Sequence, residues 1–252
     1  MSYKICHIIF STNRLEYLIP SLNSQRMLNW YGCKVDKIFI DDYPRTRNDL
    51  MLRSFLTYYN YNEIIFHKNN IGLSATWTEF WNMIRDREYD YIFHQEDDVV
   101  FLEPICISDL IEILEKDKQI SQVTLSRQAW YSNEQDPSAN NDDIIYKNFR
   151  YQKNSCIFSP MASLYSHNII KYPWKELISH NINEGTIGKI LNDKYGMVSA
   201  NVKNFFGLKL INHIGEWFTG KRILPGEPGF ETYGHFDPNK RYTSKDGRLL
   251  YE

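Results

Sequence analysis

The sequence predicts an α/β fold with a mostly parallel central sheet flanked by helices. In the first hundred residues, apolar strand-like runs alternate with stretches of helical periodicity, and repeated crossovers of this kind make neighbouring strands parallel. Polar residues follow each predicted strand, where the ligands of such sheets collect. With 252 residues, of which 42% are hydrophobic, the chain can bury one large core. We therefore expect a single domain.

The first half is predicted to contain four strands and three helices in alternation. The strands are apolar runs rich in Ile, Phe and Tyr, and the helices carry apolar residues three or four positions apart. Pro20 lies early enough in the first helix to be tolerated. In chain order the elements are strand Tyr3–Ser11, helix Leu15–Met27, strand Val35–Ile40, helix Asp49–Tyr58, strand Glu63–His67, helix Ser74–Ile84 and strand Tyr89–His94.

The second half is less regular. Its expected elements are helix Ser108–Lys116, strand Ser121–Leu125, a solvated loop or lid at Ser132–Asp143, a strand or hairpin at Ser155–Tyr165, helix Thr186–Asp193 and a last strand at Phe206–Ile211. From Pro225 onward the sequence is rich in Gly and Pro and shows little periodicity. We expect a tail there.

Composition excludes several classes of protein. A net charge of −2 and a pI near 6.4 offer no broad basic field, so we expect no nucleic-acid partner. The N-terminal run is too short for a signal sequence, and no segment approaches the 18 or so apolar residues that cross a bilayer, so we expect no transmembrane segment. A cytoplasmic protein with four free cysteines is the expectation.

Three consecutive carboxylates, Glu96, Asp97 and Asp98, follow the fourth predicted strand. Successive side chains of a strand face opposite ways, so the strand must end there in a turn for the three to approach one site. A buried and unpaired cluster of this kind would be very costly unless a cation or hydrogen-bond donors meet it. Carboxylate oxygens suit Mn or Mg, which complete their shells with phosphate oxygens. The alternative is a solvated acidic turn.

Four motifs together resemble a known family. The segments STNRLEYL, IFIDD, NNIGLSATW and HQEDDVVF are similar, in order and spacing, to the nucleotide-binding half of GT-A fold glycosyltransferases, and most similar to family 2. The resemblance covers residues 3–101 well and the rest more loosely. It implies a GT-A (Rossmann-like) domain with a nucleotide-sugar half (1–101), an acceptor half (102–224) and a C-terminal tail (225–252).

The resemblance also implies an activity. The family moves a sugar from a nucleoside diphosphate sugar, here most simply a UDP-sugar, to an acceptor hydroxyl, with Mn or Mg held at the acidic strand end. For this chain it implies metal-dependent inverting transfer to a carbohydrate acceptor. By resemblance Asp98 is the metal ligand, and Glu96 and Asp97 contact ribose or metal-bound water. The remaining nucleotide-binding residues implied are Thr12, Asn13, Arg14, Asp41 or Asp42, Asn70 and Gly72.

Two downstream residues bear on catalysis. Glu184 begins a predicted helix and resembles the position that supplies the catalytic base of inverting members, although Gly185 stands where the family has a second acid. His213 follows the last predicted strand, and similar His-x-Gly segments lend an imidazole to the metal or diphosphate. The alternatives are a helix N-terminal Glu stabilised by the helix dipole and a histidine with only a packing role.

Other functions stay open. A non-catalytic nucleotide- or sugar-binding protein would keep the acidic residues without turnover. A sugar-1-phosphate nucleotidyltransferase shares the layered fold but needs a Gly-rich loop with Arg near the N-terminus, and this sequence lacks one. A metal-dependent hydrolase would use a larger His and Asp set.

Overall fold

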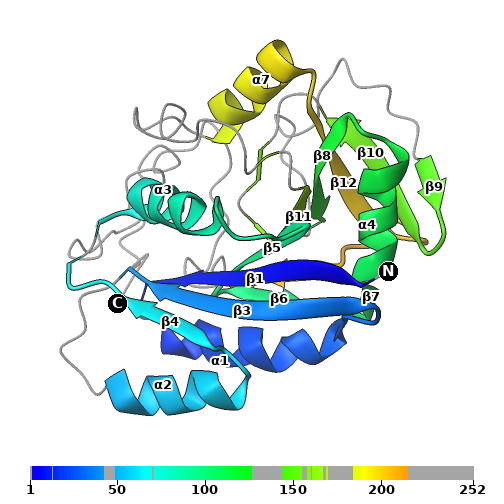
Figure 1. Ribbon diagram of the computed structural model, residues 1–252. Helices are drawn as coiled ribbons and strands as arrows, with labels where there is room; N and C mark the ends of the chain where they lie inside the picture. Colours follow the sequence, from blue (N-terminus) through cyan, green and yellow to red (C-terminus); the bar gives the residue numbers. More distant parts are fainter. Residues whose placement is uncertain are drawn as a thin grey trace, which may run out of the picture.

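A computed structural model of the chain describes residues 2–12, 14–42, 49–69, 71–126, 144–154, 158–159, 161–166, 169 and 184–214. Its centre is a nine-stranded sheet in the order β4-β3-β1-β5-β11-β8-β12-β10-β9 (Figure 1). The expected loop at 132–143 and the expected tail from 225 onward lie outside the described residues.

Four neighbouring strands form a parallel block, as the alternation of elements predicted. They are β4 (Glu63–Phe66), β3 (Cys33–Asp41), β1 (Tyr3–Ser11) and β5 (Tyr91–Glu96). Their register pairs Ser11 with Asp41 and Phe10 with Glu96. The polar residues that end these strands therefore meet at one edge of the sheet.

The other strands complete a mixed sheet. β11 (Ser163–Ser166) runs antiparallel between β5 and β8 (Ile120–Leu125), and β12 (Val198–Asn204) is parallel to β8. The antiparallel hairpin of β9 (Ile144–Tyr146) and β10 (Phe149–Asn154) forms the far edge. Two small sheets pair β6 (Val99–Phe101) with β13 (Ile211–His213) and β2 (Leu28–Asn29) with β7 (Ile105–Cys106).

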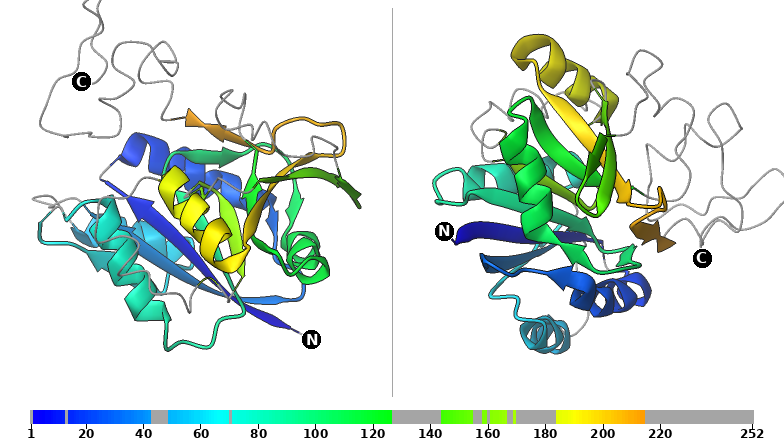
Figure 2. Two further views of the ribbon diagram at one scale, coloured as in Figure 1. Left: turned by 90° about the horizontal axis from the view of Figure 1, so that it is seen from above. Right: turned by 90° about the vertical axis from the view of Figure 1, so that its right-hand side faces the viewer.

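Helices cover both faces of the sheet, which is why its central strands are apolar on both sides. In Figures 1 and 2, α1 (Leu15–Ser24) and α2 (Asp49–Tyr58) lie on one side and α3 (Leu73–Ile84) and α7 (Glu184–Tyr195) on the other. Ile9 packs with α1 and α2, while Ile8 and Phe10 pack with α3. α1 continues as a short 3-10 turn at Gln25–Met27, and α4 (Ile107–Lys116) packs against the sheet and β6.

One prediction for the second half is wrong, and another is confirmed only in part. Phe206–Ile211 is not a strand, because residues 204–208 form a turn between β12 and β13, with Gly207 at φ 78°. The apolar residues of this turn look like a strand in sequence but are exposed. For Ser155–Tyr165 a strand or hairpin was expected, and in the described part of that range β11 supplies a strand that starts at Ser163; the β9–β10 hairpin before it was not predicted.

The first-half predictions are confirmed to within a few residues, and strand Tyr3–Ser11 and helix Asp49–Tyr58 match β1 and α2 fully. Across the described part of the chain, no helix combines the length and the apolar character needed to cross a membrane.

Candidate functional site

The acidic cluster forms a tight turn between β5 and β6. Glu96 is the last residue of β5, Asp97 and Asp98 make the turn, and Val99 begins β6. The Asp97 amide donates to the Phe10 carbonyl, which ties the turn to the end of β1. The amide of Ile214 donates to the Asp98 carbonyl at 2.8 Å, which ties the turn to the end of β13. The strand therefore ends at the acidic cluster, as the sequence predicted.

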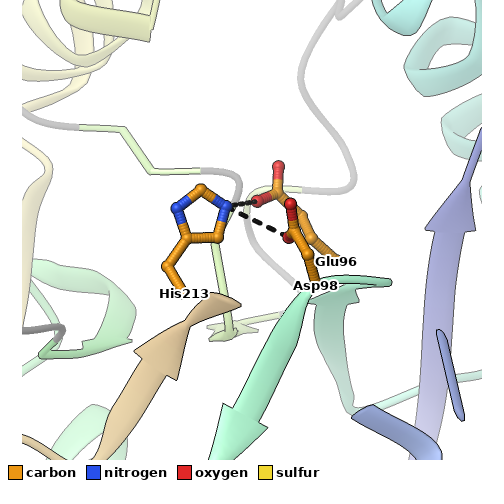
Figure 3. A group of neighbouring side chains, drawn as sticks. All are labelled: Glu96, Asp98 and His213. Carbon is orange, nitrogen blue, oxygen red and sulfur yellow. Dashed lines mark ion pairs between the residues drawn. The ribbon is translucent and has the colours of Figure 1, made fainter. Parts of the chain in front are cut away.

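Glu96, Asp98 and His213 converge on one point (Figure 3). His213 pairs with Val99 across the β6–β13 sheet, so its side chain lies beside the acidic turn. Its Nε2 is 3.1 Å from Asp98 Oδ1 and 3.8 Å from Glu96 Oε2. One ligand atom from each of the three residues lies within 4.8 Å of the others. Two carboxylates and an imidazole in this arrangement can hold a divalent cation.

The electrostatics of the turn leave negative charge in excess. Glu96, Asp97 and Asp98 bring three carboxylates, and among the described residues Arg14 forms ion pairs with two of them, Asp97 and Asp98. Burial, followed by the charge of Asp98, raises the pKa of Glu96 to about 7. Burial would also raise the pKa of Asp98, but Arg14 and His213 outweigh it and hold that pKa well below its usual range. A cation beside Glu96 and Asp98 would relieve this imbalance.

Asp97 turns away from this group and holds the loop after β1. Its side chain is fully buried and accepts hydrogen bonds from the Ser11 hydroxyl at 2.8 Å, the Thr12 amide at 3.3 Å and the guanidinium of Arg14. Arg14 also pairs with Asp98, with Nη1 2.9 Å from Oδ2. The predicted ribose contact of Asp97 stays a prediction. In this structure its carboxylate positions Arg14 at the edge of the acidic turn.

A buried polar network behind the turn was not predicted from the sequence. Gln95 Nε2 donates to Ser21 Oγ at 2.7 Å, and its Oε1 accepts from Gln25 at 3.1 Å. The Phe101 amide donates to Ser24 Oγ at 3.1 Å. One polar face of α1 thus fixes the strands on both sides of the turn. The sequence signal was the spacing of Ser21, Ser24 and Gln25, which puts three polar residues on the helix face turned toward the sheet.

Asp42 organises the turn that starts α3. Its Oδ1 accepts from the Ile71 amide and His67 Nδ1, both at 2.8 Å, and its Oδ2 accepts from the Gly72 amide at 2.7 Å. Gly72 has a φ of 83°, a conformation that favours glycine. Asp41 is fully buried at the end of β3. The structure therefore brings both aspartates to the same edge as the acidic turn, and His67 is a further residue there that the sequence reasoning missed.

The structure describes the other predicted site residues only in part. Thr12 is exposed and lies beside Asp97, with its amide bonded to that carboxylate. Glu184 is the first residue of α7. Its side chain, like Asn13 and Asn70, lies outside the described residues.

The similarity of this chain to known proteins lies in its fold. No protein-family model matches the sequence, and no curated protein matches it. Among solved structures, GalNAc-T7 with UDP, GalNAc and Mn2+ superposes with a TM-score of 0.59 at 11% identity. The chain has a GT-A fold. The match covers 90% of this chain and 45% of that one, so this GT-A chain spans less than half the length of the GalNAc-T7 chain.

Two further structures share the GT-A fold. A mannosyltransferase from Pyrobaculum calidifontis, in complex with GDP-Man and Mn2+, has a TM-score of 0.54 at 7% identity, over 93% of this chain and 69% of that one. TarS from S. aureus (residues 1–349) has a TM-score of 0.50 at 11% identity, over 85% of this chain and 62% of that one. These likenesses agree with the GT-A resemblance of the four sequence motifs.

The raised pKa of Glu96 predicts how the stability of the metal-free protein depends on pH. Between the ordinary pKa of 4.5 and the folded value of about 7, the folded state retains a proton that the unfolded chain has released. The free energy of unfolding should therefore fall as the pH rises through this window. Urea unfolding in EDTA at pH 4.5, 6 and 7.5 should show a steeper fall for the wild type than for Glu96→Gln.

The matched control is Glu88→Gln, which changes an exposed acid in the connection between α3 and β5. This variant should keep the slope of the wild type. Equal slopes for the wild type and Glu96→Gln would contradict the assigned environment of Glu96.

Proposed function

We propose that the chain is a metal-dependent glycosyltransferase that moves a sugar from a nucleoside diphosphate sugar to the hydroxyl of a carbohydrate acceptor. The observation that carries the proposal is the convergence of Glu96, Asp98 and His213 at the edge of a GT-A sheet. GalNAc-T7 and the P. calidifontis mannosyltransferase, which share this fold, are bound to a nucleotide or nucleotide sugar together with Mn2+. These complexes support the same ligand class here.

The residues present fit a Mn or Mg ion. Asp98 is almost fully buried, and its Oδ1 faces His213, while Glu96 supplies a second carboxylate oxygen. Oxygen donors with one imidazole suit Mn, and Mg would rely more on the carboxylates and water. When bound, such an ion would offset the negative charge of the donor's diphosphate, including the charge that this group carries when it leaves.

The neighbouring residues suit the rest of a nucleotide. Arg14 is held by Asp97 and Asp98 at the rim of the acidic turn, from which its guanidinium can approach a phosphate. The turn at Ile71 and Gly72 lacks a side chain at Gly72, which lets a base or ribose come close to the backbone. Asp41 and Asp42 are the candidates to accept a hydrogen bond from the ring N–H of the base. Because both oxygens of Asp42 already accept hydrogen bonds, a base would have to share one of them.

For the transfer step we propose Glu184 as the base. It would take the proton of the acceptor hydroxyl while the oxygen attacks the anomeric carbon from the face opposite the leaving diphosphate, which inverts that centre. Glu184 begins α7, and this helix packs on the face of the sheet that α3 covers.

The donor site predicts metal-dependent stabilisation by a nucleoside diphosphate. In a thermal-shift panel of UDP, GDP and dTDP, each with Mn2+, at least one should raise Tm by about 5 °C or more at 100-fold excess over its Kd. We expect UDP to give the largest shift. Asp98→Ala and His213→Ala should lose the Mn2+-dependent part of the shift, whereas Glu88→Ala, an exposed acid away from the site, should keep it. Failure of all three nucleotides would exclude the donor site.

The role of Glu184 predicts a separation of binding from turnover. Glu184→Gln should keep the Mn2+-dependent thermal shift. Its rate of nucleoside diphosphate release from a panel of UDP-sugars should be lower than that of the wild type by about 100-fold or more, because general base catalysis typically contributes that much. The readout is nucleoside diphosphate released with water or an added sugar as acceptor. Asp193→Asn, an exposed acid of the same helix, is the control and should keep the wild-type rate. Full activity in Glu184→Gln would rule Glu184 out as the base.

A further inference from the structure

A lysine of the sheet lies on the face that α1 covers. Lys37 on β3 and His7 on β1 are direct cross-strand partners, so their side chains share one face. Ile9, two residues after His7 on the same strand, packs with α1, which identifies that face. Burial lowers the pKa of Lys37 to about 8. At pH 7 the side chain is therefore still largely an ammonium group, which can only donate hydrogen bonds.

The ammonium group of Lys37 sets the direction of a chain of hydrogen bonds. It donates to Gln25 Oε1 at 3.0 Å and to the Tyr59 carbonyl at 3.2 Å. Because the oxygen of Gln25 faces Lys37, its amide nitrogen points away and donates to Gln95 Oε1 at 3.1 Å. The same nitrogen donates to the Tyr61 hydroxyl at 2.7 Å. One cation therefore orients both side-chain amides, since a Gln25 amide turned over would place its NH2 group against the ammonium.

The side-chain amide of Gln95 makes the four hydrogen bonds that such an amide can make. Its oxygen accepts from α1 as described and from His7 Nε2 at 3.1 Å. Its nitrogen donates to Ser21 Oγ at 2.7 Å and to the Val99 carbonyl at 3.4 Å. Because the Ser21 hydroxyl accepts from Gln95, its own proton goes to the Glu96 carbonyl at 3.4 Å. The chain of donors thus ends on the backbone on both sides of the acidic turn.

The position of Gln95 also decides which way Glu96 points. In the register of β1 with β5, Gln95 is the partner of Ile9 and Glu96 is the partner of Phe10. Ile9 packs with α1, whereas Phe10 packs with α3 on the other face of the sheet. Because successive side chains of a strand alternate, a Gln95 that is held by α1 turns Glu96 away from that helix. The Glu96 carboxylate is thereby kept beside His213 (Figure 3).

We propose that Lys37 and Gln95 are positioning residues of the cation site. They would hold the acidic turn through the backbone of Glu96 and Val99, on the face that α1 covers. Movement of the turn would leave buried polar groups unpaired, which is costly in a low-dielectric interior. Cation binding needs such support, because metal–ligand distances tolerate shifts of only about 0.2 Å. This role rests on the cation site of the proposed glycosyltransferase.

Mn2+ titrations followed by electron paramagnetic resonance test this role. The signal of the free aqua ion gives the Kd of the full-length protein for Mn2+ at pH 7, and Tm in EDTA is recorded for each variant. Gln95→Met keeps the length of the side chain without its hydrogen bonds. It should raise the Kd about tenfold or more, as removal of groups that hold metal ligands typically does. Lys37→Met should raise it about threefold, because it acts through two amides.

Gln122→Met is the matched control. Gln122 on β8 is also buried and hydrogen-bonded, to Ser159 and Ser163, but β11 separates its strand from β5. This variant should lower Tm in EDTA much as Gln95→Met does and keep the wild-type Kd for Mn2+. Lys37 is only half-buried, so Lys37→Met decides the question if Gln95→Met does not fold.

The outcomes separate the positioning role from the cation site. If Gln95→Met and Lys37→Met bind Mn2+ as tightly as the wild type, the positioning role is wrong and the cation site stands. The positioning role is also wrong if Gln122→Met weakens binding as much as Gln95→Met, because the loss would then reflect general loosening of the core. A wild type that binds no Mn2+ at millimolar concentration would overturn the cation site and the positioning role together.

Discussion

Three carboxylates at the end of a buried strand set the main constraint on this structure, and within its described part the guanidinium of Arg14 pairs with two of them. When all three carboxylates are ionised, Arg14 offsets one negative charge and two remain. The chain divides the cluster by direction: Asp97 faces the loop after β1, and Glu96 and Asp98 face His213. A divalent cation beside Glu96 and Asp98 would neutralise the two remaining charges, whereas protonation of His213 would offset only one.

The fold supports this turn from three directions. The parallel register of β1 with β3 and β5 brings Ser11, Asp41 and Glu96 to one edge of the sheet. The polar face of α1 fixes Gln95 and the start of β6 from behind. The β6–β13 pairing brings His213, more than a hundred residues later in the sequence, beside Asp98. Movement of any of these elements would separate the three candidate ligands.

Much of this arrangement could be predicted from the sequence, because local patterns and strand order determine it. The periodicity of the first hundred residues predicted the parallel block, and the position of Glu96–Asp98 after a buried strand predicted the acidic turn. The region of β9, β10 and β12 could not be predicted. The apolar run at Phe206 looks like a strand, but hydrogen bonds to Asn204 and the positive φ of Gly207 make it a turn.

Within the site, the sequence indicated which residues gather but not how each one is oriented. Glu96 and Asp97 are neighbours in sequence, yet one lies beside His213 and the other holds Arg14. Side-chain alternation predicts such a split, but the position of the turn decides which residue faces which way. The hydrogen bonds of Asp42 to the amides of Ile71 and Gly72 likewise depend on the pairing of β3 with β4.

The most direct test of the cation site is anomalous scattering from crystals grown with MnCl2 and UDP. Data collected on either side of the Mn absorption edge should show one strong anomalous peak within coordination distance of Asp98, His213 and Glu96, with the diphosphate of UDP on its open side. A well-defined UDP with no anomalous peak beside these three residues would contradict the account, as would a peak held by other residues.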